Sequence, residues 1–408
     1  MKLIQILKKN AIPSFCSSNS QVIEILFKFC KFHKVPLLVE STSNQVNQYG
    51  GYSNNTPKEF IKKIKKIAEK EKFNKKKLFF GGDHLGPLPW KLHKSREALR
   101  RSIRLIRSYI NADYQKIHID TSIKCLDDNK INNKIVFERT ALIFRKLNLD
   151  KYKNLFFVFG TEVPLSGGND KSKIKQTSIT QIKEEHKNFK NLLKSETNSF
   201  ALVIEPGMKF MHNNVTKPIF KNFVIKKKFS KKNNFIFEAH STDYQQINTL
   251  KKLVSNNFKF LKVGPELTYE LTRSILFMEK LEKTLNYKSN FSKILYLEMK
   301  KNRKYWLSYF NNKKKTVFDK IVKSKFDRTR YYLERKKVLK AINILKNNIN
   351  NLELNKILIK LRRKDKQYFI KIKKVFRLNN FQTLNYFYLN KVLIKYFKAC
   401  DFKLNNLV

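Results

Sequence analysis

Cysteine, glycine and proline are scarce in this sequence, with 4, 10 and 9 among 408 residues. The four cysteines have no paired short spacing, which excludes a cysteine-rich zinc site or a disulfide scaffold and favours a reducing cytoplasm. So few glycines and prolines leave little room for long flexible linkers. A hydrophobic content of 41% is sufficient for a globular fold, as one large domain or a domain with an appendage.

Long hydrophobic runs are also missing. No apolar stretch reaches the length that a membrane-spanning helix needs, so we expect no membrane partner. The segment Met1 to Lys9 lacks an apolar core followed by a small-residue cleavage site. We therefore expect no signal peptide and a cytoplasmic protein.

Acidic residues are few: 32 Asp and Glu stand against 87 Lys and Arg, a net charge of +55. Such an excess indicates either a polyanion site or a solvated basic surface. The cations are spread over the whole chain, together with many Asn, Ile and Phe residues, all of which have A/T-rich codons. This distribution favours compositional drift. Because no nucleic-acid-binding motif accompanies the charge, we expect no specific nucleic-acid partner.

The residues that are present alternate between short apolar runs and segments with helical spacing. Thr56 and Pro57 form an N-cap followed by a first-turn proline, and helical stripes cover 20–32, 95–110, 241–254 and 265–285. We expect eight strands, at 11–16, 36–40, 77–81, 116–120, 155–160, 200–205, 234–239 and 258–264.

Eight strand–helix alternations in about 285 residues have the usual length of a (β/α)8 TIM barrel. A doubly wound open sheet is the competing fold, but no Gly-rich dinucleotide fingerprint follows the first strand. We therefore predict a barrel over residues 1–285. Residues 286–408 are rich in Lys, Asn, Leu and aromatics, and we predict a helical C-terminal extension that caps the barrel or binds a partner chain.

Reactive side chains gather where the predicted strands end, which is where barrel enzymes build their sites. A glycine-rich stretch, Gly81 to Pro87, contains the Asp83-His84 pair. The other strand ends carry Glu40 with Gly50 and Gly51, His118 and Asp120, Glu162, Glu205, Glu238 and His240 with Ser241 and Thr242, and Lys262 with Gly264.

Each of these residues has an ordinary structural alternative. A single Glu40 or Glu205 is more often a helix cap or ion-pair partner than a catalyst, and His118 could equally be a core histidine. The convergence is more informative, because three of only seven histidines fall at the same end of three strands. His84 and His240, with carboxylates from Asp83, Glu162 or Glu205, form a candidate site for Zn²⁺ or another divalent ion.

Longer motifs carry a family resemblance. They occupy residues 40–52, 81–87, 116–120, 160–164, 238–245 and 261–265, and they continue at 305–306 and 327–332. Together these motifs resemble the accessory (Z) subunit of class II D-tagatose-1,6-bisphosphate aldolase, the GatZ/KbaZ family. The match runs in order from near the N-terminus through the predicted barrel and weakens over about the last sixty residues.

The resemblance implies a subunit of galactitol or N-acetylgalactosamine catabolism that supports the activity and stability of a zinc-dependent catalytic (Y) subunit, with a chaperone-like role. It also implies that Asp83 stands at the aldolase acid/base position, with His84 and His240 at zinc-binding positions. The chain departs at the sixth strand, where Glu205 replaces a further histidine ligand. A carboxylate in place of an imidazole does not forbid a metal ion, but it changes the chemistry of the site from that of the aldolases.

The candidate site residues therefore fall into three groups. We expect catalytic roles for Asp83, Glu40 and Asp120, and metal binding by His84, His240, Glu162 and Glu205. We expect a sugar-phosphate ligand to contact Gly50, Gly51, Ser241, Thr242, Lys262 and Gly264. Two functions remain open: a noncatalytic partner of the Y subunit, or a metal-dependent ketohexose-phosphate enzyme, either a C4 epimerase or an aldolase.

Overall fold

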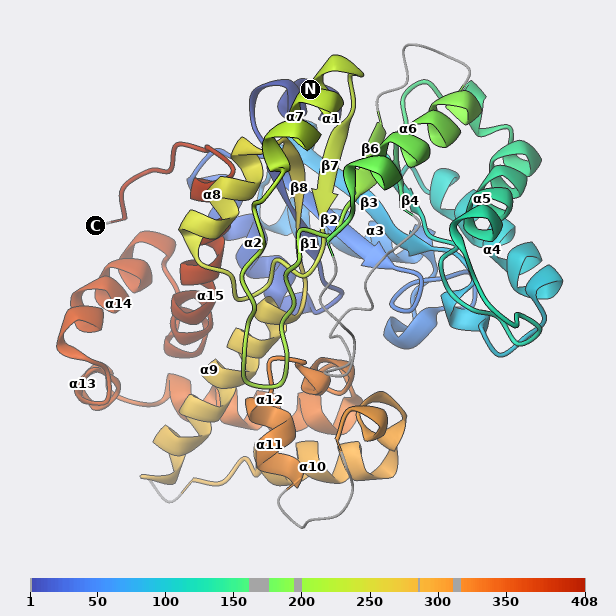
Figure 1. The fold of residues 1–408 in the computed structure, drawn as a ribbon. Helices are drawn as coiled ribbons and strands as arrows, with labels where there is room; N and C mark the ends of the chain where they lie inside the picture. Colours follow the sequence, from blue (N-terminus) through green and yellow to red (C-terminus); the bar gives the residue numbers. More distant parts are fainter. Residues whose placement is uncertain (1, 161–175, 194–199, 285–286, 311–316, 408) are drawn as a thin grey trace.

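The computed structural model describes residues 2–160, 176–193, 200–284, 287–310 and 317–407. Its centre is a closed barrel of eight parallel strands in sequence order, in which β8 pairs with β1 (Figure 1). The strands are β1 (Ile12–Cys16), β2 (Leu37–Thr42), β3 (Leu78–Leu85), β4 (Lys116–Ile119), β5 (Phe156–Phe159), β6 (Phe200–Val203), β7 (Ile236–Ala239) and β8 (Phe258–Val263). All eight predicted strands are present, and the TIM-barrel prediction is confirmed.

Helices follow the strands and cover the outside of the barrel. They are α2 (Ser20–Phe32), α3 (Pro57–Lys70), α4 (Ser95–Ile110), α5 (Asn133–Leu147), α6 (Ile179–Leu193), α7 (Phe223–Lys232), α8 (Ile247–Ser255) and α9 (Pro265–Lys283). The Thr56 hydroxyl accepts from the Glu59 N–H, and the Glu59 carboxylate accepts from the Thr56 N–H, which makes a capping box before α3. The helix predicted from Ser241 begins later, because Ser241 and Tyr244 adopt positive φ angles.

The two ends of the barrel differ in polarity. At the amino ends of the strands, Leu3, Ile6 and Leu7 of helix α1 (Leu3–Lys9) pack against an apolar interior layer. That layer contains Ile12, Leu38, Phe79, Phe156, Val158, Ala201, Val203 and Phe260. One end of the barrel is thus closed by hydrophobic packing, so the polar groups of the interior lie toward the carboxyl ends of the strands.

The residues after α9 are predominantly helical, as predicted. They form α10 (Phe291–Lys301), α11 (Val317–Lys323), α12 (Lys336–Asn350), α13 (Leu354–Ile359), α14 (Arg363–Phe376) and α15 (Asn380–Ala399), with a 3₁₀ turn, η7, at Arg328–Tyr331. Figure 1 shows α10, α11 and α12 on the side of the barrel toward which the strand arrows point. The domain boundary near residue 285 remains a prediction.

Helix α15 closes the outer layer of the barrel. It packs against β1, α2, α8 and α9, so a helix from the end of the described chain covers the seam between β8 and β1. The ring of Phe397 lies 5.7 Å from that of Phe15 and 5.3 Å from that of Phe29. Within the described residues, no helix combines the length and the apolar character needed to cross a bilayer.

A candidate metal and acid/base site at the barrel mouth

A cavity of about 110 Å³ opens at the carboxyl ends of the strands. Its lining includes Asp83, His84, Asp120, His240 and Lys262, five residues that the sequence places at strand ends. The cavity therefore lies where the fold predicts an active site.

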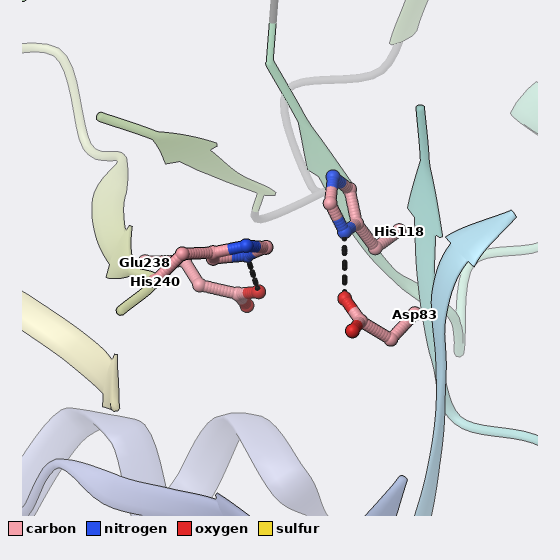
Figure 2. A group of neighbouring side chains, drawn as sticks. All are labelled: Asp83, His118, Glu238 and His240. Carbon is pink, nitrogen blue, oxygen red and sulfur yellow. Dashed lines mark hydrogen bonds and ion pairs between the residues drawn. The ribbon is translucent and has the colours of Figure 1, made fainter. Parts of the chain in front are cut away.

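Four buried side chains in this region can hold a metal ion: Asp83, His118, Glu238 and His240. One ligand atom from each lies within 4.8 Å of the others, and the four residues come from β3, β4 and the end of β7 (Figure 2). Two imidazoles and two carboxylates form a donor set that suits Zn²⁺ and related divalent ions.

Each imidazole of this group is paired with a carboxylate. His118 Nδ1 lies 2.9 Å from Asp83 Oδ1, and His240 Nε2 lies 2.9 Å from Glu238 Oε1 (Figure 2). The Nε2 atom of His118 is buried and has no hydrogen-bond partner among the described residues. In this group the nitrogen of His118 that faces Asp83 is Nδ1, and Nε2 points away from that carboxylate (Figure 2).

An irregular end of β3 explains how two consecutive residues reach the cavity. The register between β3 and β4 shifts between Gly82 and Leu85, and His84 adopts a φ of +48°. This bulge breaks the alternation of a regular strand, so Asp83 and His84 both line the cavity. Gly81 is needed for a different reason: a Cβ there would lie 2.7 Å from Oε1 of Glu40.

Two buried lysines complete the floor of the barrel mouth. The Lys116 ammonium lies 2.6 Å from Glu40 Oε1 and 2.5 Å from Glu238 Oε2, and all three side chains are fully buried. Lys262 pairs with Glu40 and lies 2.8 Å from Asp83 Oδ2. Charges buried at this depth are tolerated only when they are paired, so this network connects β2, β3, β4, β7 and β8 electrostatically.

The charge of the network fits a divalent cation. Glu40, Asp83, Asp120 and Glu238 supply four negative charges, and Lys116 and Lys262 supply two positive ones. The carboxylates therefore exceed the ammonium groups by two, so the network attracts a cation even when His84 carries a proton in its pair with Asp120. This excess of negative charge, together with the N₂O₂ donor set, means that the residues fit a divalent ion.

The environment also sets the protonation of these groups. Burial would raise the pKa of Asp83, but the charges of His84 and Lys262 and the hydrogen bond from His118 hold that pKa well below its ordinary value. Burial lowers the pKa of His240 to about 4, which keeps its imidazole neutral at pH 7. The pair of Asp83 and His240 thus offers an anionic oxygen and a neutral nitrogen, the forms in which both groups bind metals.

His84 has a different partner from the other two histidines. Its Nδ1 lies 2.8 Å from Asp120 Oδ2, and its ring centroid lies 4.9 Å from that of His240. Burial opposes the charged form of His84, yet Asp83 and Asp120 raise its pKa above the ordinary value. Burial would raise the pKa of Asp120, but His84 lowers it to about 2. This pair therefore has the character of an ion pair beside the four-residue group.

The structure gathers most of the residues predicted from the sequence. Glu40, Asp83, His84, Asp120 and His240 all lie in or directly beside the charged network. Glu205 follows β6 and is buried, but it belongs neither to the four-residue metal group nor to the cavity lining. Glu162 lies outside the described residues.

Of the residues predicted to contact a ligand, some line the cavity and others do not. Ser241, Lys262 and Gly264 line the cavity, whereas Gly51 lines a neighbouring groove of about 1240 Å³. Gly50 and Gly51 both have positive φ, and a Cβ on Gly51 would overlap the Gln45 carbonyl. The Thr242 hydroxyl donates to the Lys262 carbonyl and contacts the Tyr396 hydroxyl, which is a structural role.

Several functional residues lie outside the predicted groups. Lys116 has a sequence signal, since it lies two residues before His118 and so shares one face of β4 with it. His118 and Glu238 share their strand faces with Asp120 and His240, which is a second signal. Tyr52, Arg330 and Tyr331 also line the cavity, and strand-end reasoning cannot find them because none lies in or directly after a strand.

Comparisons with known proteins agree with this architecture. A family model described as "D-tagatose-1,6-bisphosphate aldolase subunit GatZ/KbaZ-like" matches residues 3–401. The chain is 32% identical over 360 residues to the "D-tagatose-1,6-bisphosphate aldolase subunit GatZ" of Escherichia coli O6:K15:H31, covering 84% of this chain and 86% of that protein. The corresponding protein of Escherichia coli O1:K1 gives the same identity and coverage.

A solved structure has the same fold over nearly the whole length. It is described as a "probable tagatose 6 phosphate kinase" from Sinorhizobium meliloti 1021, and it superposes with a TM-score of 0.82 at 26% sequence identity. The superposition covers 96% of this chain and all of the other. The barrel and the helices that follow it therefore form one recurrent architecture.

Proposed function

The chain belongs to the GatZ/KbaZ-like family of D-tagatose-1,6-bisphosphate aldolase subunits, and we propose that it acts as the accessory subunit of a class II aldolase of this kind. In this role it supports full activity and stability of a catalytic (Y) subunit, with a chaperone-like contribution, in galactitol or N-acetylgalactosamine catabolism. The observation that carries the proposal is the family match, which extends through the barrel and the helices that follow it. A cytoplasmic location accords with this role.

The barrel mouth supports a chemical contribution from this subunit. Asp83, His118, Glu238 and His240 would hold the divalent ion, which in such sites polarises a carbonyl or hydroxyl oxygen. Asp83 is the candidate acid/base group because it is ionised and lines the cavity. His118 and Lys262 fix its two oxygens at 2.9 and 2.8 Å, and this holds the carboxylate in one orientation.

Co-expression with the catalytic subunit tests the accessory role. We expect the two chains to co-purify and the half-life of tagatose 1,6-bisphosphate cleavage at 37 °C to lengthen relative to the catalytic subunit alone. An exposed-residue variant, Glu184→Gln on α6, should behave like the unmodified chain. Unchanged activity and lifetime in the presence of this chain would refute the accessory role.

A second function is favoured by one observation, the fully buried network of paired charges around Asp83. Such a network is costly to build and is typical of sites that control protonation. We therefore also propose a metal-dependent activity of the chain alone on a ketohexose phosphate, either C4 epimerisation or aldol cleavage. The test is an assay of the isolated chain with Zn²⁺ or Mn²⁺ against tagatose and fructose phosphates, with Asp83→Asn as the inactive control.

A further inference from the structure

A short turn of the C-terminal region reaches the barrel mouth. Arg330 and Tyr331, in the 3₁₀ turn η7, line both the cavity of about 110 Å³ and the larger groove beside it. They face residues of the barrel that belong to the candidate metal site, since Asp83 and His240 line the same cavity. The helical extension therefore contributes part of the wall of this cavity.

The Arg330 guanidinium is held in a fixed position. Its Nη1 donates to the carbonyl oxygens of Phe326 and Asp327 at 2.8 and 2.9 Å, and its Nη2 donates to the Tyr331 hydroxyl at 3.1 Å. These contacts use three of its five N–H donors. The remaining two, one each on Nε and Nη2, have no hydrogen-bond partner among the described residues, so they are available to a ligand.

Within the described part of the chain, the charge of Arg330 is paired only with one carboxylate, at the outer limit of ion-pair distance. Among the described residues, the nearest carboxylate oxygen is Asp327 Oδ2, 4.0 Å from Nη1. That carboxylate already accepts hydrogen bonds from the hydroxyls of Thr268 and Thr329. A rigid, incompletely paired guanidinium at the wall of a cavity is suited to bind an anionic group.

The rest of the cavity suits a small polyhydroxylated molecule. The Tyr331 ring stacks on Tyr305 at 4.5 Å with 2° between the planes, and its edge contact with Tyr52 measures 4.8 Å. Thr42, Asn44, Gln45 and Ser241 add hydroxyl and amide groups to the lining. A volume of about 110 Å³ is several times the roughly 10–15 Å³ that one water needs, so the cavity can hold more than solvent.

The cavity is electrically polarised. Its floor has more carboxylates than ammonium groups, whereas Arg330 is a cation at the wall. The adjoining groove extends the positive side: it is lined by Lys63, Arg335, Lys336, Lys337 and Lys340 against only Glu298 and Glu334. A ligand with one anionic end is therefore oriented, with that end at Arg330 and its neutral oxygens toward the metal group.

We propose that Arg330 is the anion-recognition residue of a composite site for a small sugar that carries one anionic group. The barrel supplies the metal group and the hydroxyl-binding residues, and the C-terminal turn supplies the guanidinium. Both a phosphate ester and a sugar carboxylate have the required chemistry. The site requires only this chain, so it can exist whether or not the chain also supports a catalytic subunit.

Isothermal titration calorimetry at 0.15 M NaCl tests the proposal on the full chain. The probes are fructose 6-phosphate, glucuronate, fructose and inorganic phosphate, with Zn²⁺ present throughout. We expect one of the two anionic sugars to bind at least about 10-fold more tightly than either fructose or phosphate. The tighter of the two identifies the anionic group. Equal affinity for all four probes, or binding of phosphate as tight as that of both sugars, would overturn the proposal.

Variants then assign the recognition to Arg330. Arg330→Gln should weaken binding of the preferred sugar by about 10- to 100-fold, and Arg330→Lys, which keeps the charge without the fork, should weaken it less. The matched control is Arg363→Gln, an exposed arginine on α14, which removes the same charge and should leave affinity within about twofold. Wild-type affinity in Arg330→Gln refutes the assignment, and so does wild-type affinity in Arg330→Lys if the glutamine variant does not fold.

The same variants separate this inference from the accessory role. Co-purification with the catalytic subunit should be unchanged in Arg330→Lys, because that role does not require the guanidinium fork. Loss of sugar binding with retained co-purification supports both proposals. Absence of sugar binding in the wild type, with intact co-purification, overturns only the composite site.

Discussion

Replacing Lys116 by methionine tests whether the buried charge network has the energetics that its geometry indicates. Lys116 is fully buried and lies 2.6 and 2.5 Å from carboxylate oxygens of Glu40 and Glu238. Its ammonium also lies 4.6 Å from the centre of the Phe260 ring. Methionine preserves most of the unbranched stem, so Lys116→Met removes the charge with little change in packing.

The expected cost follows from the loss of one buried partner. Removing one member of a buried ion pair typically costs about 3–5 kcal/mol, because the remaining charge is left uncompensated. Here Glu40 still pairs with Lys262, and Glu238 still contacts His240, so we expect the lower part of that range. The double variant Lys116→Met/Glu238→Gln should recover about 1 kcal/mol or more, since it also removes an uncompensated carboxylate.

The same substitution should strengthen metal binding. It removes one positive charge from the floor, which favours a cation at the four-residue group. At a metal concentration 100 times its dissociation constant, a bound ion adds about 2.7 kcal/mol to the free energy of unfolding. Lys116→Met should therefore be less stable than wild type without metal and should gain more stability than wild type from Zn²⁺ or Mn²⁺.

Urea denaturation with and without metal measures both effects. Lys374→Met, at an exposed position on α14, is the control and should change the free energy of unfolding by less than about 0.5 kcal/mol. A loss below about 1 kcal/mol in Lys116→Met would contradict the argument, because Lys116 would then not be compensating buried carboxylates. A smaller metal-dependent gain than in wild type would contradict the assignment of the metal site.

Three further predictions concern other parts of the molecule. Glu238→Gln should retain the fold but lose bound metal by elemental analysis after dialysis, and metal retained at the wild-type ratio would contradict Glu238 as a ligand. Burial raises the pKa of Asp243 to about 7 from its ordinary 3.8, so between these pH values the folded state binds a proton that the unfolded state has lost. The free energy of unfolding should therefore fall as pH rises from about 4 to 7. In urea titrations Asp243→Asn should flatten this pH dependence, and an unchanged dependence would refute the shift. Phe397→Ala should cost about 3–5 kcal/mol of unfolding free energy, because its ring packs on Phe15 and Phe29, and a cost below 1 kcal/mol would contradict the role of α15.

The barrel could be predicted from sequence because its signals are local. Each strand is a short apolar run, and helix α3 begins with the capping pair of Thr56 and Glu59. Reactive residues at strand ends were predictable for the same reason, since a parallel barrel brings all carboxyl ends together. Asp83, His240 and Asp120 follow directly from that rule.

Other parts of the site depend on a strand irregularity and on contacts between residues far apart in the sequence, which local patterns do not reveal. The bulge after Gly82 places both Asp83 and His84 at the cavity, and alternation in a regular strand would have separated them. The apolar pattern of β4 does not reveal that Lys116 pairs with glutamates from β2 and β7. Arg330 reaches the cavity only because the extension folds back over the barrel mouth, and no spacing rule connects it to Asp83.

Helix α15 has a consequence for how the molecule folds. Asn10, just before β1, donates its side-chain amide to the carbonyl of Cys400, a contact between residues 390 positions apart. Contacts of such sequence separation form late and slow the folding of a chain. During synthesis, Phe15 of β1 and Phe29 of α2 therefore stay uncovered until α15 has been synthesised and Phe397 can pack on them. This interval exposes an apolar surface to aggregation, so the cellular yield of the protein should depend strongly on temperature and on chaperones.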